Sequence, residues 1–145
     1  MTTVVQTMSA EETYGLGFDM GRTAEPGGIY ALNGDLGTGK TVFTKGFAAG
    51  LGVREPVTSP TFTILQVYES GRLPLFHFDI YRIAEAGEMD EIGYEEYFFG
   101  NGVTLVEWAG LFPELIPPEA VTVTIRKDMK KGTDFREITI EGVRP

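Results

Sequence analysis

The segment of this sequence most suited to chemistry is a glycine-rich octapeptide with the spacing of a phosphate-binding loop. Residues 34–41, Gly-Asp-Leu-Gly-Thr-Gly-Lys-Thr, fit the pattern G-x4-G-K-[ST]. Glycines let the backbone curl so that successive N–H groups point at phosphate oxygens, and the start of a following helix adds partial positive charge. Lys40 would reach the β and γ phosphates, and the Thr41 hydroxyl would bind Mg²⁺. The motif predicts a nucleoside triphosphate site.

The flanking sequence supports this interpretation. An apolar run of buried-strand type, residues 29–32, precedes the motif, and a helix is expected over 39–51 with Gly52 as its C-cap. Strand, loop and helix therefore follow in the order that a phosphate loop requires. We expect the side chain of Lys40 to lie in a solvent-filled loop. The residues expected to bind the nucleotide are Asp35, Leu36, Gly37, Thr38, Gly39, Lys40, Thr41 and Val42.

Two acidic residues end apolar strands farther along the chain. Asp79 ends the run 75–79, and Glu107 follows the run 103–106. Carboxylates that serve a metal ion lie at such strand ends in sheets of this kind, so a metal role is expected for at least one of them. His77 alternates with Asp79 along its strand and is expected to share its face. For this histidine a structural role is the simpler interpretation.

The remaining patterns predict an α/β fold, a P-loop NTPase-like mixed β-sheet flanked by helices, with antiparallel strand additions. A capping box at 9–12 predicts a helix with Tyr14, Phe18 and Gly21 on one face, ending near 26–28. Short helices are expected within 84–99. Further strands are expected at 2–7, 61–68, 73–83, 102–106, 121–125 and 136–140, the last two forming a hairpin. No linker or repeat interrupts the chain, so residues 1–145 are expected to form one domain.

Composition and charge exclude several classes of function. The chain has no cysteine and one histidine, which excludes disulfides, thiolate metal sites and a multi-histidine metal site. Its net charge is −9, and no Lys or Arg occurs between Arg82 and Arg126. Strong direct binding of tRNA is therefore not expected. No apolar run approaches the roughly 18 residues of a membrane span, so we expect a soluble, cytoplasmic protein with no membrane association.

Five blocks in a fixed order resemble the TsaE family, also known as YjeE. They are Gly-Asp-Leu-Gly-Thr-Gly-Lys-Thr (34–41), Thr-Ser-Pro-Thr-Phe (58–62), His-Phe-Asp-Ile-Tyr-Arg (77–82), Glu-Ile-Gly-Tyr (91–94) and Val-Glu-Trp (106–108). The resemblance covers about residues 1–125 and leaves the C-terminal hairpin without a recognised block. It implies a bacterial ATPase that uses ATP and Mg²⁺ and is required for threonylcarbamoyladenosine formation in tRNA. It also implies TsaD- and TsaB-type partners, with hydrolysis resetting the complex between turnovers.

The resemblance implies roles for single residues. Lys40 would be the phosphate lysine, Thr41 a Mg²⁺ ligand, Asp79 a metal-side acid, and Glu107 a further acid that polarises water or the metal shell. Trp108 would lie beside the nucleotide. Segment 58–62 would be switch-like, with Thr61 supplying a hydroxyl near the γ phosphate. Residues 109–112 hold no basic residue, unlike many family members. With no cation from 83 to 125, we expect slow hydrolysis by the isolated chain and activation by partners.

Three alternatives remain open at this point. A GTPase switch is disfavoured because the chain has no Asn-Lys-x-Asp segment to recognise guanine. A small-molecule kinase is disfavoured because the arginine-free stretch 83–125 leaves no obvious cationic lid. A binding module that does not hydrolyse nucleotide is the third, and only a rate measurement separates it from an ATPase.

Overall fold

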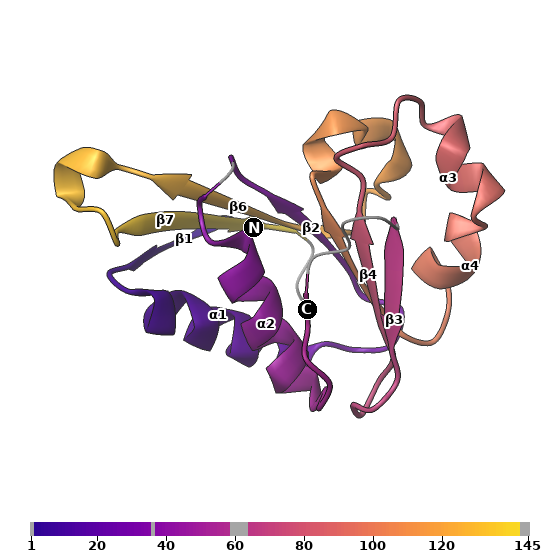
Figure 1. Ribbon diagram of the computed structural model, residues 1–145, viewed down its shortest axis with the longest axis horizontal. Helices are drawn as coiled ribbons and strands as arrows, with labels where there is room; N and C mark the ends of the chain where they lie inside the picture. Colours follow the sequence, from indigo (N-terminus) through magenta and orange to yellow (C-terminus); the bar gives the residue numbers. More distant parts are fainter. Residues whose placement is uncertain (1, 36, 59–63, 143–145) are drawn as a thin grey trace.

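The computed structural model describes residues 2–35, 37–58 and 64–142, which form a seven-stranded sheet between helices (Figure 1). The strand order is β1-β7-β6-β2-β5-β4-β3. The central strands β6, β2, β5 and β4 are parallel, whereas β3, β7 and β1 are added by antiparallel pairing. The strands are β1 (Thr2–Thr7), β2 (Ile29–Asn33), β3 (Leu65–Tyr68), β4 (Leu75–Asp79), β5 (Val103–Glu107), β6 (Val121–Lys127) and β7 (Arg136–Glu141). The predicted α/β class with a mixed sheet is confirmed.

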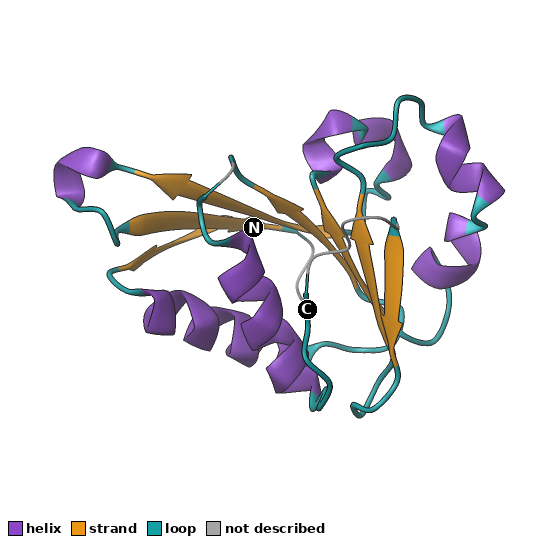
Figure 2. Ribbon diagram, viewed as in Figure 1, coloured by secondary structure: helices purple, strands orange, loops and turns teal. Residues whose placement is uncertain are grey.

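The helices cover the two faces of the sheet unequally (Figure 2). The α-helices and 3-10 helices are α1 (Ala10–Thr23), α2 (Lys40–Leu51), α3 (Gly87–Glu91), α4 (Tyr94–Phe98), η1 (Ala109–Leu111), η2 (Pro113–Leu115) and η3 (Met129–Lys131). Helices α1 and α2 lie side by side on one face, and α3, α4, η1 and η2 lie over the β4–β5 side of the other. In the described chain no helix covers that second face at β1, β7 and β6.

Strand β2 divides the core, because alternate side chains point to opposite faces. Tyr30 and Leu32 pack with the aromatic side chains of α2, Phe43 and Phe47. Ile29 and Ala31 belong to the cluster that contains the buried residues of α3 and α4. Both faces of β2 are therefore buried, which fixes the position of the loop that follows it.

Helices α1 and α2 approach so closely that only glycine fits at four contact positions. A Cβ atom at any of them would collide with a carbonyl oxygen of the opposite helix, so a larger residue would force the helices apart. The pairs are Gly17 with Phe43, Gly21 with Phe47, Gly46 with Tyr14, and Gly50 with Phe18. This packing anchors the body of α2, whose first turn belongs to the phosphate loop.

Most predicted elements are present, with corrections at their ends and faces. Strand β4 ends at Asp79 rather than at 83, because the Asp79 carboxylate accepts a hydrogen bond from the Tyr81 N–H (3.0 Å) and turns the chain. Strand β3 begins at Leu65, and residues 61–63 of the predicted strand lie outside the described residues. The buried stripe of α1 is Thr13, Gly17 and Gly21; the side chains of Tyr14 and Phe18 lie at the surface. In the described ranges no helix is long and apolar enough to cross a membrane.

Candidate nucleotide-binding site

The phosphate loop connects the carboxyl end of β2 to the start of α2. Gly37 (φ 78°) and Gly39 (φ 103°) adopt left-handed backbone conformations that favour glycine. The Thr38 hydroxyl donates a hydrogen bond to the Asp35 carbonyl oxygen (2.8 Å), which closes the loop on itself. Leu36 lies outside the described residues. The strand, loop and helix predicted around the motif are therefore present in that order.

Lys40 is buried rather than in a solvent-filled loop, which corrects the expectation from sequence. Only 7% of the residue is exposed, and its ammonium donates hydrogen bonds to the carbonyl oxygens of Gly34 and Asp35. The same ammonium lies 3.7 Å from the centre of the Trp108 ring. Burial lowers the pKa of Lys40, while the charges of nearby acids, Glu107 foremost, act in the opposite direction. The loop carbonyls and the indole satisfy this cation.

The two candidate acids lie next to each other at the carboxyl edge of the sheet. Strands β4 and β5 are parallel neighbours with Asp79 paired to Glu107, so both side chains leave the same face. Glu107 is buried and Asp79 is half-buried. Burial raises the pKa of the Asp79 carboxyl and Glu107 adds to that rise, although the Tyr81 N–H opposes it. Two carboxylates beside one buried lysine form a compact charged cluster.

His77 holds Glu107 from the neighbouring strand. Its Nε2 lies 2.6 Å from Oε2 of Glu107, and both side chains are almost completely buried. The Nδ1 atom of His77 has no hydrogen-bond partner in the described part of the chain. The predicted sharing of one face with Asp79 is confirmed. The contact with Glu107 depends on strand order, and sequence patterns alone indicated only a structural role for His77.

Trp108 adopts the only left-handed backbone conformation among the described non-glycine residues (φ 65°). Its ring packs against Tyr81 with 4.6 Å between ring centroids, and it also contacts the Lys40 ammonium. The chain then enters η1, where the Gly110 N–H donates to the Asn33 side-chain oxygen (2.8 Å). This bond ties the segment after Glu107 to the end of β2. Sequence reasoning singled out Trp108 but missed Tyr81 and Asn33.

The C-terminal hairpin supplies two cations to the phosphate loop. Arg136 donates from Nε to the Thr38 carbonyl oxygen (2.7 Å) and from Nη2 to the Gly37 carbonyl oxygen (3.5 Å). The Lys127 ammonium lies beside Gly37, 3.2 Å from the place a Cβ there would occupy. Neither residue was found from sequence, because no recognised block covers the hairpin. Only the pairing of β6 with β2 brings them to the loop.

The other predicted site residues have different outcomes. Thr61 and most of segment 58–62 lie outside the described residues. Thr41 is exposed in the first turn of α2, and Val42 lines a small hollow of about 70 Å³ together with Ser9 and Asp134. Arg82, the last cation before the stretch 83–125, is exposed beyond the end of β4.

The donor set suits a magnesium ion shared with a ligand. Within the described ranges no three side chains of His, Cys, Asp or Glu converge on a metal position. Mg²⁺ is commonly held by one or two carboxylates together with water and substrate phosphates. Asp79 and Glu107 at the carboxyl edge of the sheet, and Thr41 in the first turn of α2, provide oxygen ligands of that kind. The residues present therefore fit Mg²⁺ and do not form a closed structural metal site.

A glycine-rich loop between a buried parallel strand and a helix, with acids ending the next two strands of the sheet, β5 and β4, defines a P-loop-type α/β protein. Comparison with known proteins identifies the family. The family described as "Threonylcarbamoyl adenosine biosynthesis protein TsaE" matches residues 7–138. The chain belongs to the TsaE family, which is involved in threonylcarbamoyladenosine biosynthesis in tRNA.

Individual relatives agree with this assignment. A Bacillus subtilis protein named "tRNA threonylcarbamoyladenosine biosynthesis protein TsaE" is 47% identical over 138 residues, which is 95% of this chain and 84% of the relative. A Treponema pallidum protein of the same name is 43% identical over 132 residues, covering 91% and 95%. The crystal structure of Bacillus subtilis YdiB superposes with a TM-score of 0.84 at 42% identity, covering 99% of this chain and 87% of that one.

Proposed function

We propose that this chain is a P-loop ATPase subunit of threonylcarbamoyladenosine biosynthesis. It binds ATP with Mg²⁺, and hydrolysis resets or couples a modifying complex of TsaD- and TsaB-type subunits. The observation that carries the proposal is the convergence of Lys40, Asp79 and Glu107 at the phosphate loop. One buried cation and two neighbouring acids are the groups that a metal-bound triphosphate needs.

Lys40 has to exchange partners when ATP binds. Its ammonium is held by the loop carbonyls of Gly34 and Asp35, which occupy the place of an anion. The β and γ phosphates offer stronger, charge-assisted hydrogen bonds and would draw the ammonium away from those carbonyls. Trp108 lies against the lysine and restricts where it moves. The side chain is thus positioned before the ligand arrives.

The surroundings of the phosphate loop support one orientation of the bound nucleotide. The γ phosphate would point toward Asp79 and Glu107, since these acids lie on the Lys40 side. The nucleoside would then leave over the first turn of α2, toward the hollow that Val42 lines with Ser9 and Asp134. This orientation makes the N-terminus of α1 and the C-terminal hairpin the walls of the nucleoside site.

Glu107 and Asp79 have unequal tasks in this proposal. Bound Mg²⁺ would neutralise developing phosphate charge, with Thr41 and the two acids as its protein ligands. His77 fixes the Glu107 carboxylate through one oxygen, Oε2, and leaves the other for water or metal. Asp79 is more exposed than Glu107, and its Oδ1 accepts a hydrogen bond from the Tyr81 N–H. Its other oxygen would bind Mg²⁺ or water at the more exposed side of the site.

Coupling to partners is supported by the scarcity of cations on the side of the phosphate loop where Asp79 and Glu107 lie, since Arg136 and Lys127 are at Thr38 and Gly37. The stretch 83–125 has no Lys or Arg, so the isolated chain is expected to hydrolyse ATP slowly. TsaD- and TsaB-type subunits would supply charge near the γ phosphate or bring the Thr61 hydroxyl to it. We expect those subunits, rather than this acidic chain, to bind tRNA.

The deciding experiment combines calorimetry with phosphate release. We expect ATP to bind with Mg²⁺, GTP to compete poorly, and phosphate release to accelerate when TsaD- and TsaB-type subunits are added. Absence of ATP binding would overturn the nucleotide site, and fast hydrolysis unaffected by the subunits would overturn the coupling. Preferential GTP binding would favour the switch, a phosphorylated small-molecule acceptor the kinase, and binding without hydrolysis the binding module.

A further inference from the structure

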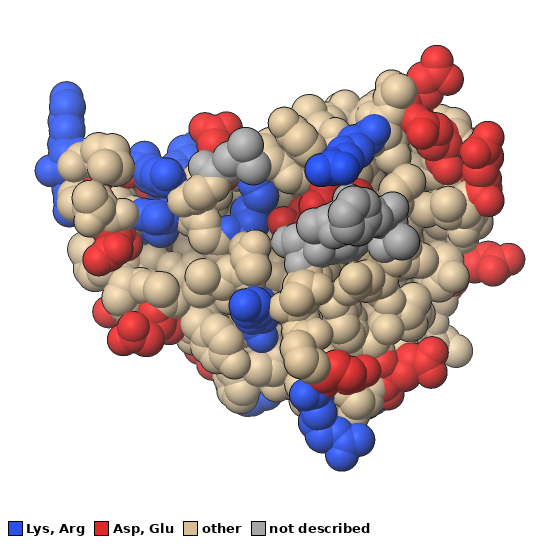
Figure 3. Space-filling model, viewed as in Figure 1, with Lys and Arg blue, Asp and Glu red and all other residues tan. Residues whose placement is uncertain are grey.

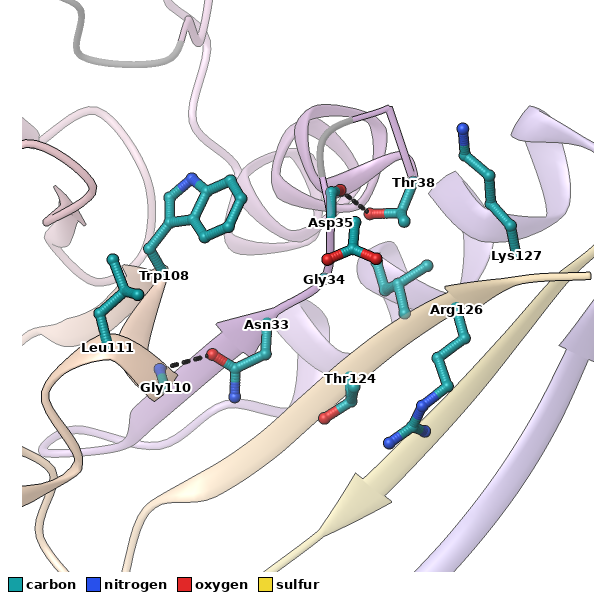
Figure 4. Close-up of a pocket in the computed structure, with 11 residues that line it drawn as sticks. Asn33, Gly34, Asp35, Thr38, Trp108, Gly110, Leu111, Thr124, Arg126 and Lys127 are labelled. Atoms are coloured by element: carbon teal, nitrogen blue, oxygen red, sulfur yellow. Dashed lines mark hydrogen bonds between the residues drawn. The ribbon is translucent and has the colours of Figure 1, made fainter.

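A second, open site lies on the far side of the phosphate loop from the charged cluster. It is a groove of about 700 Å³ on the sheet face that α1 and α2 do not cover, at the carboxyl ends of β2 and β6 (Figure 4). Asn33 and Thr124 form its floor. Trp108 and Leu111 stand on one side, and Lys127 stands on the other.

Side chains along β6 alternate between the two faces of the sheet, and this alternation determines which of them face the groove. Val123 and Ile125 point into the core beside α2, so Thr124 and Arg126 must point to the uncovered face. The Arg126 guanidinium donates to the Thr139 hydroxyl on β7 (3.3 Å). Among the described residues, neither Arg126 nor Lys127 forms an ion pair. By the same alternation Lys127 points to the α2 side, where its ammonium lies beside Gly37 at the edge of the groove. Arg126 on the uncovered face and Lys127 at the phosphate loop therefore both border the groove, in a chain of net charge −9.

The distribution of charge on the surface favours an acidic peptide over a nucleic acid as the anionic ligand of the groove. Basic side chains gather over the β6–β7 hairpin, whereas acids gather over α3 and α4 (Figure 3). Asp35 also lies in the groove wall. An extended phosphate backbone would also reach the acids over α3 and α4, whereas a short peptide needs to match only the groove, where Asp35 is the one acid among the lining residues and Arg126 and Lys127 are cations. Leu111 is 51% exposed on the groove's rim and offers contact to an apolar side chain.

We propose that this groove binds an acidic segment of a partner protein, with carboxylates at Arg126 and Lys127 and an apolar side chain against Leu111. The groove is bounded by the phosphate loop and by η1, which follows Glu107 and Trp108. A segment bound there contacts both sides of the candidate nucleotide site. The binding itself does not require the ATPase activity proposed above.

The test uses fluorescein-labelled peptides and fluorescence anisotropy with the full chain. The first probe is a twelve-residue peptide with glutamates around a central leucine, the second has lysine in place of each glutamate, and the third is a twelve-nucleotide single-stranded RNA. Arg126→Glu reverses a groove charge. Lys130→Glu makes the same change in η3, outside the groove, where the side chain is exposed.

We expect the glutamate peptide to bind the parent and Lys130→Glu within twofold of each other. The Arg126→Glu variant should bind the glutamate peptide at least about tenfold more weakly than the parent does. It should also bind the lysine peptide better than the parent does. Equal loss in both variants, no binding to the parent, or preferred binding of RNA would overturn the proposal. ATP affinity measured on the same samples tests the nucleotide site separately, since its absence would leave the peptide result standing.

Discussion

Charged side chains lie on both sides of the phosphate loop, but they are buried on one side and exposed on the other. On the β4–β5 side, Lys40, His77 and Glu107 are buried and have fixed partners: His77 and Glu107 contact each other, and Lys40 binds the loop carbonyls of Gly34 and Asp35. On the β6 side, Arg126 and Lys127 are exposed around an open groove without ion pairs in the described chain. Buried charges need fixed partners, whereas exposed charges remain available to a ligand. The closed side therefore suits chemistry, and the open side suits recognition.

The largest expected effect lies on the closed side, at Glu107. Glu107→Gln keeps the shape of the side chain but removes the charge that organises metal and water. We expect ATP binding to persist and hydrolysis to fall by about 10²–10³. Phosphate release under saturating ATP measures this effect. Glu114→Gln, an exposed acid in η2, is the control and should hydrolyse at the parent rate; equal rates in all three proteins would contradict the assigned role.

The second effect concerns ATP affinity. Lys40→Ala removes a charge-assisted contact to phosphate worth about 1.5–3 kcal/mol, which corresponds to roughly a 10- to 150-fold loss of affinity. Calorimetric titration with ATP and Mg²⁺ measures the change. Lys45→Ala removes an exposed lysine from the same helix and should bind ATP as the parent does. Unchanged affinity in Lys40→Ala would show that the loop does not bind phosphate.

The third effect is on stability, where the two sides should differ most clearly. His77→Phe leaves the Glu107 carboxylate buried without its partner, and we expect unfolding to become easier by about 1–3 kcal/mol. Thr124→Val, in the groove floor, should change stability by less than about 0.5 kcal/mol. Urea denaturation of both variants measures the contrast. Similar losses in the two variants would remove the distinction between a closed side and an open side.

The smallest effect is a pH dependence. Because burial raises the pKa of Asp79, the folded protein holds that proton more tightly than the unfolded chain does. The resulting stabilisation is complete below the ordinary pKa and is lost as the pH rises through the raised one. The amide side chain of the Asp79→Asn variant stays neutral, so the variant does not lose this stabilisation. Its unfolding free energy should therefore rise relative to that of the parent as the pH rises through that window. Urea unfolding at a series of pH values tests this, and an unfolding free energy of the variant minus that of the parent that stays constant or falls with rising pH would refute it.

Local sequence was sufficient for much of the fold. The capping box fixed the start of α1: the Ser9 hydroxyl accepts from the Glu12 N–H (3.1 Å), and the Glu12 carboxylate accepts from the Met8 N–H (2.8 Å). Gly52 ends α2 in a left-handed conformation, as its position predicted. These features depend on residues a few positions apart, so spacing reveals them. The end of β4 was misjudged because an aspartate turn outweighed an apolar run.

Residue types and their spacing were enough to predict the phosphate loop, its flanking strand and helix, and the two acids at strand ends. Which side chains meet at that loop depends on the order of the strands in the folded sheet. His77 reaches Glu107 across 30 residues, and Arg136 reaches Thr38 across 98, because parallel pairing places β4 beside β5 and β6 beside β2. The burial of Lys40 against Trp108 likewise depends on a left-handed residue after β5. The spacing of residues along the chain indicates local structure, such as a helix, a strand or a turn. Contacts between strands depend instead on the order of the strands in the sheet, in which β2 is central and buried on both faces.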